Sequence, residues 1–242
     1  NMQTINSNVA FIGNADRTIG GGTSIADRLT INGNISGGGT GTYLYVSTEN
    51  NLGTVTLNGT NSIAKILVVQ TGQLNVSRVT NAGVAGTLGS GTTLVFGNGG
   101  ASQPNLWYTG TSANSTNRTI NLNGGTTRII SQDAKLTLAG NISPTGATPV
   151  LQLSGDGGGN FNEVSGVISG NIAVQVVSHQ PVGGTAEAGA WILSGNNTYT
   201  GATTINAGTL ALGASDVLPN LSAVSIGSAT LEAATFADTA GT

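Results

Sequence analysis

The titratable side chains that could do chemistry gather in one stretch, residues 144–188. Asp156, Glu163, His179 and Glu187 lie there, and two such carboxylates could act as the acid and the base of a glycosidase- or lyase-like reaction. No Lys or Arg follows Lys135, so an anionic polysaccharide would find no positive side chain to bind it. His179, in the sequence SHQPVGG, is expected to lie exposed in a loop. We therefore expect no catalytic residue in this stretch.

A metal or cofactor site has little support from the residue types. The segment GDGGGN (residues 155–160) is similar to one unit of the calcium-binding glycine repeats, but those need several Asp-bearing nonapeptides in tandem. The chain contains no Cys, which excludes disulfides and thiolate metal sites. We interpret the segment as a loop and expect neither a metal nor a cofactor.

Three aromatic residues are candidates for a contact surface. In the sequence TYLYVS, Leu44 and Val46 share one side of the expected strand, and Tyr43 and Tyr45 share the other. Trp107 lies between two residues that are expected to point inward. These aromatic side chains could stack on sugars or contact another protein, or a neighbouring loop could cover them. Both alternatives stay open at this point.

The elements that must position these residues are short strands. Only 7% of the residues are charged, against roughly 25% in typical soluble domains. The hydrophobic fraction is 38% and the mean hydropathy is +0.11, which indicates a folded rather than a disordered chain. Leu, Ile and Val occur in short runs between Gly, Asn, Thr and Ser, as in strands joined by turns. The fold is therefore expected to be all-β.

The charge and the apolar runs exclude two kinds of partner. A net charge of −3 disfavours nucleic acid, which binds clustered Lys and Arg. The longest purely apolar runs, such as ILVV at residues 66–69, are far shorter than the ~20 residues of a membrane span. We therefore expect no nucleic acid partner and no membrane span in this chain.

A long internal repeat organises the chain. Asp16-Arg17-Thr18-Ile19 returns as Asn117-Arg118-Thr119-Ile120. LTINGNIS (residues 29–36) returns as LTLAGNIS (residues 136–143), and GTVTLNGTNS (residues 53–62) returns as GAWILSGNNT (residues 189–198). The separation between matching positions grows along the chain, so the second copy holds two insertions, one of six residues and one of about 29. The larger insertion is expected to form one more coil and a loop.

These features predict a single-stranded right-handed parallel β-helix, a β-solenoid, because each coil contacts only its neighbours and insertions bulge from corners. At ~20–25 residues per coil, about ten to twelve coils would form a rod on the order of 50 Å long. A β-sandwich does not readily explain an insertion of a whole coil. We expect one continuous solenoid over residues 1–242, with repeat copies at about 11–100 and 101–220 and a further repeat beginning at about 221–242.

The repeat also predicts which side chains point into the solenoid. Leu44 and Val46 correspond to Leu151 and Leu153, while the Tyr45 position faces outward in both copies. The remaining inward positions are Leu74, Val76, Leu193, Ile205, Leu210 and Leu212, and Val69 lies before a turn. Gly72, Gly195 and Gly208 are expected to turn the chain. Outward Thr, Asn and Ser would form hydrogen-bonded ladders, whereas stacked like charges would repel.

The motif LSGNNTYTGATTINAGTLALG (residues 193–213) resembles the passenger-associated transport repeat of bacterial autotransporters, also called the autotransporter-associated β-strand repeat. LTLAGNIS and VSGVISG resemble its "LTLSGxISG" coil, and ATLEAATFADTAGT (residues 229–242) resembles the opening of another repeat. The resemblance implies secreted or surface-displayed right-handed β-helices on the bacterial exterior that serve as stalks, adhesins or fibres. The family's motif carries no catalytic residue.

The expected function is that of a non-enzymatic extracellular structural element of a passenger protein: a stalk, an adhesive surface or a fibre-forming unit. Expected partners are copies of the chain, associated end to end or laterally into fibres, other parts of a longer passenger chain, and surface glycans. The alternative is a carbohydrate-binding or carbohydrate-cleaving β-helix protein that uses the inserted stretch and the Tyr43–Tyr45 pair.

Overall fold

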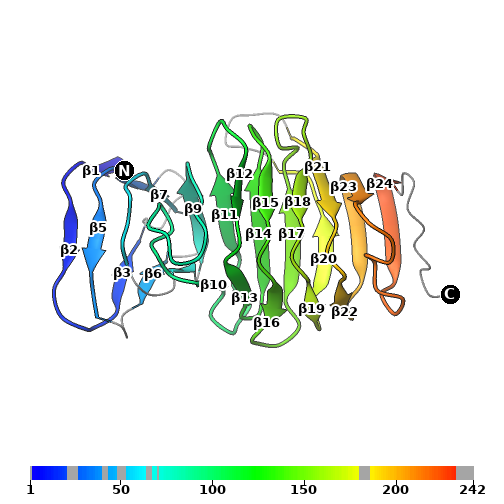
Figure 1. Ribbon diagram of the computed structural model, residues 1–242, viewed down its shortest axis with the longest axis horizontal. Helices are drawn as coiled ribbons and strands as arrows, with labels where there is room; N and C mark the ends of the chain where they lie inside the picture. The colour runs from blue at the N-terminus through cyan, green and yellow to red at the C-terminus, as the bar shows by residue number, and fades with distance from the viewer. Residues whose placement is uncertain are drawn as a thin grey trace.

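The computed structural model describes residues 2–20, 27–39, 43–47, 53–63, 67–69, 71–179 and 186–232. Within these residues every regular element is a β-strand and none is a helix, so no helix there could cross a membrane. The strands stack along one axis, from β1 at one end to β24 at the other (Figure 1). The last part of the expected further repeat, residues 233–242, lies outside the described residues, and so do the side chains of residues 67–69.

Three rows of strands form the sides of a triangular coil, and the chain visits them in a fixed order. The first face contains β1 (Met2–Ile5), β4 (Arg28–Ile31), β7 (Thr54–Leu57), β9 (Gly72–Val76), β11 (Pro104–Tyr108), β14 (Thr126–Ser131), β17 (Val150–Ser154), β20 (Ala173–Val176) and the beginnings of β23 (Thr203–Leu212) and β24 (Val224–Glu232). The second face contains β2 (Val9–Phe11), β5 (Ile35–Gly37), β12 (Asn114–Thr116), β15 (Leu136–Leu138), β18 (Asn162–Val164), β21 (Gly189–Leu193) and the ends of β23 and β24. The third face contains β3 (Arg17–Ile19), β6 (Leu44–Val46), β8 (Leu67–Val69), β10 (Thr93–Phe96), β13 (Thr119–Leu122), β16 (Ile142–Pro144), β19 (Ser169–Gly170) and β22 (Thr198–Tyr199).

Strand pairing within the faces is parallel throughout, which confirms the predicted parallel β-helix. Thr30 lies beside Thr56, and Gln152 lies beside Gln175. The number of residues between paired positions on the first face differs from coil to coil. It is smallest from β7 to β9, where Leu57 pairs with Val76, and largest from β9 to β11, where Val76 pairs with Tyr108. Coil lengths therefore vary more than the expectation of roughly 20–25 residues, because the connections at the corners differ in length while the strands keep their register.

The two insertions in the second repeat copy have different consequences. The larger one forms β18, β19 and β20, which is one full coil, as expected. The six-residue insertion lies before Leu136 and provides the residues of β14, one extra face. From Leu136 onward, each position of the second repeat copy therefore lies one face further around the coil than its counterpart in the first copy. Leu44 lies on the third face in β6, whereas its counterpart Leu151 lies on the first face in β17.

The inside of the coil is a continuous aliphatic core. All inward positions predicted from the alternation, apart from Val69, whose side chain lies outside the described residues, are at most 4% exposed: Leu44, Val46, Leu74, Val76, Leu151, Leu153, Leu193, Ile205, Leu210 and Leu212. Period-2 alternation predicts burial well here because each strand has one face in the core and the other in solvent.

Two glycines predicted to turn the chain act in different ways. Gly208 lies where β23 passes from the first to the second face, and its φ of 94° is a conformation that favours glycine. Gly195 has no such φ. It is needed because a Cβ there would clash with the carbonyl oxygen of Gly166, one coil earlier, and Gly166 stands in the same relation to Gly140. Gly195 lies at a bend between β21 and β22, where the chain was predicted to turn, and glycine is required there for close packing between coils rather than for a positive φ.

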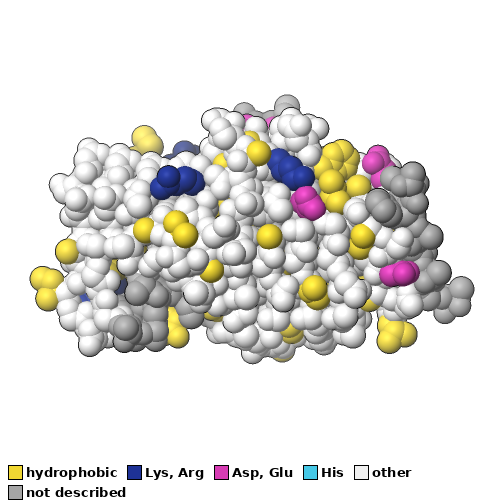
Figure 2. Space-filling model, in the orientation of Figure 1, with side chains coloured by type: hydrophobic (Ala, Val, Ile, Leu, Met, Phe, Trp, Pro, Cys, Tyr) yellow, Lys and Arg dark blue, Asp and Glu magenta, His cyan; other side chains and the backbone are white. Residues whose placement is uncertain are grey.

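Polar side chains on the outside form the expected ladders. Asn58 Nδ2 donates to Asn32 Oδ1 at 2.8 Å, and Asn32 Nδ2 donates to Asn6 Oδ1 at 2.7 Å. On the first face, Gln152 Nε2 donates to Gln175 Oε1 at 2.9 Å. In the asparagine ladder the amides satisfy one another without adding charge, whereas the glutamine ladder continues to the guanidinium of Arg128, which donates to Gln152 Oε1 at 2.7 Å. The exposed surface is accordingly dominated by uncharged polar groups (Figure 2).

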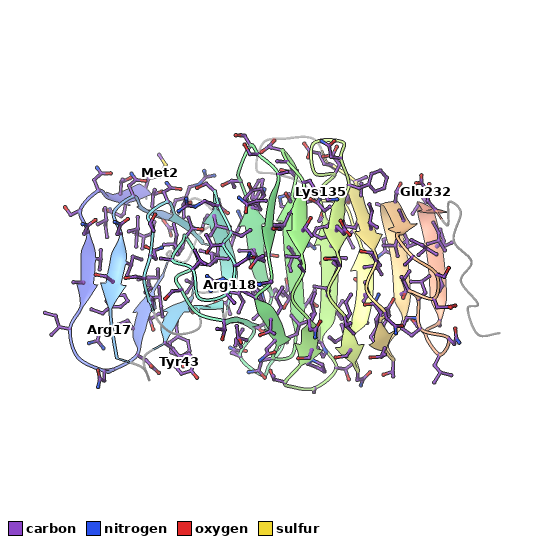
Figure 3. The ribbon with its side chains drawn as sticks, in the orientation of Figure 1. Met2, Arg17, Tyr43, Arg118, Lys135 and Glu232 are labelled. Atoms are coloured by element: carbon purple, nitrogen blue, oxygen red, sulfur yellow. The ribbon has the colours of Figure 1, made fainter. Side chains whose placement is uncertain are left out.

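Arg118 is the exception, a charged side chain that is fully buried at the start of β13 (Figure 3). Its guanidinium donates to the carbonyl oxygens of Thr80, Val84, Gly89 and Gly91, within the irregular segment that connects β9 to β10. Burial lowers the pKa of Arg118, yet an arginine stays protonated in proteins. The residue therefore helps to fix a segment whose strand pairing is limited to the isolated antiparallel bridge between Gly86 and Asn61.

Replacing Arg118 by Met should reduce the free energy of unfolding by about 3 kcal/mol or more, because several buried carbonyls lose their donor. Arg78→Met is the matched control. Arg78 is exposed and donates to Thr60 Oγ1 at 3.2 Å, so its loss should change the stability by no more than about 0.5 kcal/mol. Urea unfolding followed by circular dichroism measures both. Equal effects of the two substitutions would contradict the role given to Arg118.

Candidate functional site

Tyr43 and Tyr45 form a tilted aromatic pair on the third face, near the N-terminal end (Figure 3). Their ring centroids are 5.8 Å apart with an interplanar angle of 35°, and both side chains are half-buried. The Tyr43 N–H donates to Asp16 Oδ1 at 2.8 Å. Burial and the neighbouring Asp16 carboxylate raise the pKa of Tyr45, so its hydroxyl stays protonated at neutral pH. The pair offers a partly open aromatic surface.

Trp107 and His179 are brought together although they are far apart in the sequence. Trp107 points outward from β11, and the His179 ring meets it edge-on, with centroids 4.8 Å apart and planes at 75°. The segment after β20 folds back along the first face to reach it. Val177 N–H donates to the Leu153 carbonyl at 3.0 Å, and Ser154 Oγ donates to the Val177 carbonyl at 2.9 Å. Trp107 is thus covered by a neighbouring segment, one of the two alternatives left open.

The expectation that His179 is exposed was wrong, since only 8% of the residue is accessible. Its backbone N–H and carbonyl pair with those of Glu187, both at 2.8 Å, in an antiparallel bridge that holds the segment in place. Burial and the nearby Arg128 guanidinium lower the pKa of His179 to about 4, so the ring is neutral at pH 7. Neither His179 Nε2 nor Trp107 Nε1 has a hydrogen-bond partner among the residues that the structure describes. No local pattern in the sequence marked this contact.

The acidic residues of the inserted stretch are engaged separately. Glu163, in β18, accepts from Lys135 Nζ at 2.9 Å and from Ser194 Oγ at 2.6 Å. Burial raises the pKa of Glu163, but the hydrogen bonds from Ser194 and Lys135 outweigh it and the pKa lies below its usual value. Asp156 lies in the loop after β17 and accepts from the Gly158 N–H at 2.9 Å. The described residues contain no group of three His, Asp or Glu side chains placed to hold a metal ion.

The hydroxyl groups of the segment LSGNNTYTGATTINAGTLALG serve the interior of the coil. Tyr199 Oη and Thr203 Oγ1 are 2.6 Å apart, and Ser222 Oγ lies 3.1 Å from Thr203 Oγ1 and donates to the Gly201 carbonyl. These groups form a buried chain of hydrogen bonds with no acid or base in it. The adjacent corner carries a shallow groove of about 320 Å³, lined in part by Asn196 and Pro219. The hydrogen bonds among these hydroxyl groups stabilise the corner.

Protonation of His179 should loosen the contact with Trp107. The folded-state pKa of about 4 lies below the ordinary 6.5, so the unfolded chain binds the proton more tightly. The stabilisation is complete above about pH 6.5 and declines as the pH falls towards 4, by up to roughly 3 kcal/mol. His179 is the sole histidine, so one imidazole NMR resonance reports its titration directly. A His179→Gln variant should lose this pH dependence; a titration near pH 6.5 would contradict the burial.

The comparisons with known proteins agree with this account of the corner motif. Neither a curated protein nor a solved structure matches the chain. Residues 186–212, which span β21, β22 and β23, match the family described as Passenger-associated-transport-repeat. The segment that carries Tyr199 and Thr203 of the buried hydroxyl chain is therefore similar to a passenger-associated transport repeat.

Proposed function

We propose that the chain is a non-enzymatic structural segment of an exported passenger protein, which acts as a stalk or fibre-like spacer on the bacterial exterior. The observation that carries the proposal is the continuous stack of parallel coils along the first face, from β1 to β24. Nine steps of about 4.8 Å span roughly 43 Å. Such a stack extends in one direction and has no second domain within the described residues.

The transport repeat supports an extracellular location, because passengers are secreted to the cell surface. The surface chemistry fits a spacer. Outward columns consist largely of amides and hydroxyls, such as Asn32 on Asn6 and Gln152 beside Gln175. Such ladders add hydrogen bonds between coils, and the Gln152 column also includes one partly buried charge, that of Arg128. The mechanical function of the rod then rests on its core and ladders rather than on a site.

The ionisation states of the carboxylates support the non-enzymatic part of the proposal. A glycosidase needs a carboxylic acid with a raised pKa beside a second carboxylate. The pKa of Glu163 is lowered instead, because hydrogen bonds from Ser194 and Lys135 favour its ionised form. His179 is neutral and covered, and its ring contacts Trp107 rather than a carboxylate. These groups are placed as structural contacts.

A display experiment tests the spacer role. The chain is fused between an N-terminal epitope and an outer-membrane anchor, and antibody binding to intact cells measures export. We expect display of the wild type and loss of display for Leu153→Asp, because a buried charge in the core prevents coil stacking. Thr56→Asp, at an outward position of β7, is the control and should be displayed. Retention of the wild type in the periplasm, or turnover of a polysaccharide that Glu163→Gln abolishes, would refute the proposal.

The Tyr43–Tyr45 pair favours a second, compatible function, contact with glycans on the cell exterior. Two half-exposed rings 5.8 Å apart can stack on the apolar faces of sugar rings. The Tyr43→Ala/Tyr45→Ala double variant should lose about tenfold or more in affinity on a glycan array if both rings contribute. Gln152→Ala changes the counterpart of Tyr45 in the second repeat copy and should leave binding unchanged. Absence of binding by the wild type would rule this function out.

A further inference from the structure

A column of side chains on the outside of the first face combines one positive charge with stacked amides. Arg128 in β14 lies beside Gln152 in β17, and Gln152 lies beside Gln175 in β20. These strands are neighbours in the middle of the rod (Figure 1). All three side chains point outward and are half-buried, and the coil spacing separates neighbours by about 4.8 Å. A ligand that lies along the rod would meet them in order.

The hydrogen bonds in this column all run in one direction. Arg128 donates to Gln152 Oε1 through Nε at 2.9 Å and through Nη2 at 2.7 Å. Gln152 Nε2 donates in turn to Gln175 Oε1 at 2.9 Å. Among the described residues, neither Arg128 Nη1 nor Gln175 Nε2 has an acceptor. The column therefore offers N–H groups to a ligand that carries acceptors.

The charge of Arg128 is not neutralised by the protein. Burial lowers the pKa of Arg128, and within the described ranges no carboxylate forms an ion pair with it. Residues 180–185, which the structure does not describe, include no Asp or Glu. An arginine stays protonated in proteins, and a half-buried charge without a counter-ion is unfavourable. An anion bound at the guanidinium would offset this cost.

The fold brings this charge to the inserted stretch. No Lys or Arg follows Lys135, and an anionic polysaccharide was therefore expected to find no positive side chain there. Stacking nevertheless places β14 beside β17, and β17 beside β20 of the insertion. The Arg128 guanidinium lies close enough to His179 to lower the pKa of its imidazole. The positive side chain is thus supplied by an earlier coil.

The surroundings of Arg128 favour a sugar ligand over a peptide. β14 is paired with β11 along one edge and with β17 along the other, so a peptide cannot add to it as a further strand. Recognition must come from the outward side chains. A carboxylate matches a guanidinium in charge and in shape, and hydroxyl oxygens accept hydrogen bonds from amides. A polysaccharide of acidic sugars presents both groups along one extended chain.

We propose that the column of Arg128, Gln152 and Gln175 binds an acidic polysaccharide, with a uronate carboxylate on Arg128 and a sugar hydroxyl on Gln175. Gln152 is a positioning residue, because it accepts both hydrogen bonds that orient the guanidinium. The site is separate from the Tyr43–Tyr45 pair, which lies on the third face and has rings for neutral sugars. The inference rests on the exterior location in the proposed function and adds an anionic ligand to it.

Calorimetric titration of the purified chain with a galacturonate trimer tests the site. We expect saturable binding that weakens as salt is added. Arg128→Gln should bind about tenfold more weakly or worse, because it removes the charged fork. Arg28→Gln is the matched control. Arg28 lies in the same outward column, in β4, but it is exposed and its neighbour is Thr54 rather than a glutamine. Its loss should change the affinity by no more than about twofold.

The single histidine reports whether the ligand lies at Arg128. The positive guanidinium disfavours protonation of His179, so a carboxylate that neutralises it should raise the pKa of His179 from about 4. Burial should still keep that pKa below 6.5. Arg128→Gln should raise the pKa of His179 in the free chain for the same reason, and the trimer should then raise it no further. The imidazole NMR resonance measures each titration.

Several results would refute the proposal. They are equal affinity for a neutral galactose trimer, equal competition by polyglutamate, and binding that leaves the pKa of His179 unchanged. Circular dichroism checks that the variants are folded. If Arg128→Gln does not fold, the response of His179 in the wild type still decides. Binding is measured on the purified chain, so its failure is distinct from a failure of display on cells and leaves the spacer role intact.

Discussion

The spacing of about 4.8 Å between coils is the constraint on which the whole structure depends. At this spacing the closest neighbours of a side chain are the residues at the same position in the coils before and after it. A column must therefore be apolar, as in the core, or able to donate and accept along its length, as the Asn6–Asn32–Asn58 ladder does. A charge is accommodated where the next coil supplies its complement. Lys135 against Glu163 meets this condition with an ion, and Arg118 meets it with backbone carbonyls.

Much of this could be predicted from the sequence because the determining pattern is local. Alternation along a strand assigns Leu44 and Val46 inward and Tyr43 and Tyr45 outward without any knowledge of their neighbours, and the repeat transfers the assignment to Leu151. The full coil formed by β18, β19 and β20 could likewise be predicted, since the inserted stretch is long enough for one coil. Alternation and length are properties of a few consecutive residues.

The features that could not be predicted depend on contacts between distant residues. Burial of His179 follows from a segment that folds back to Trp107, and neither residue has a local pattern that specifies the other. The six-residue insertion before Leu136 could have formed a bulge or a strand. It forms β14. Because β14 adds one strand to the coil, every later position of the repeat lies on a different face from its counterpart in the first copy. Gly195 is required because the carbonyl oxygen of Gly166, one coil earlier, leaves no room for a Cβ. This close approach cannot be read from the sequence around Gly195.

The segment that carries His179 also alters how the rod should come apart. In a solenoid whose coils touch only adjacent coils, thermal fluctuations can peel the structure from either end one coil at a time. The contact of His179 with Trp107 joins the coil after β20 to the coil of β11, across the intervening strands β14 and β17. Those coils cannot separate individually without breaking that contact. We therefore expect the coils from β11 to β20 to separate together, whereas coils nearer the ends can fray one at a time.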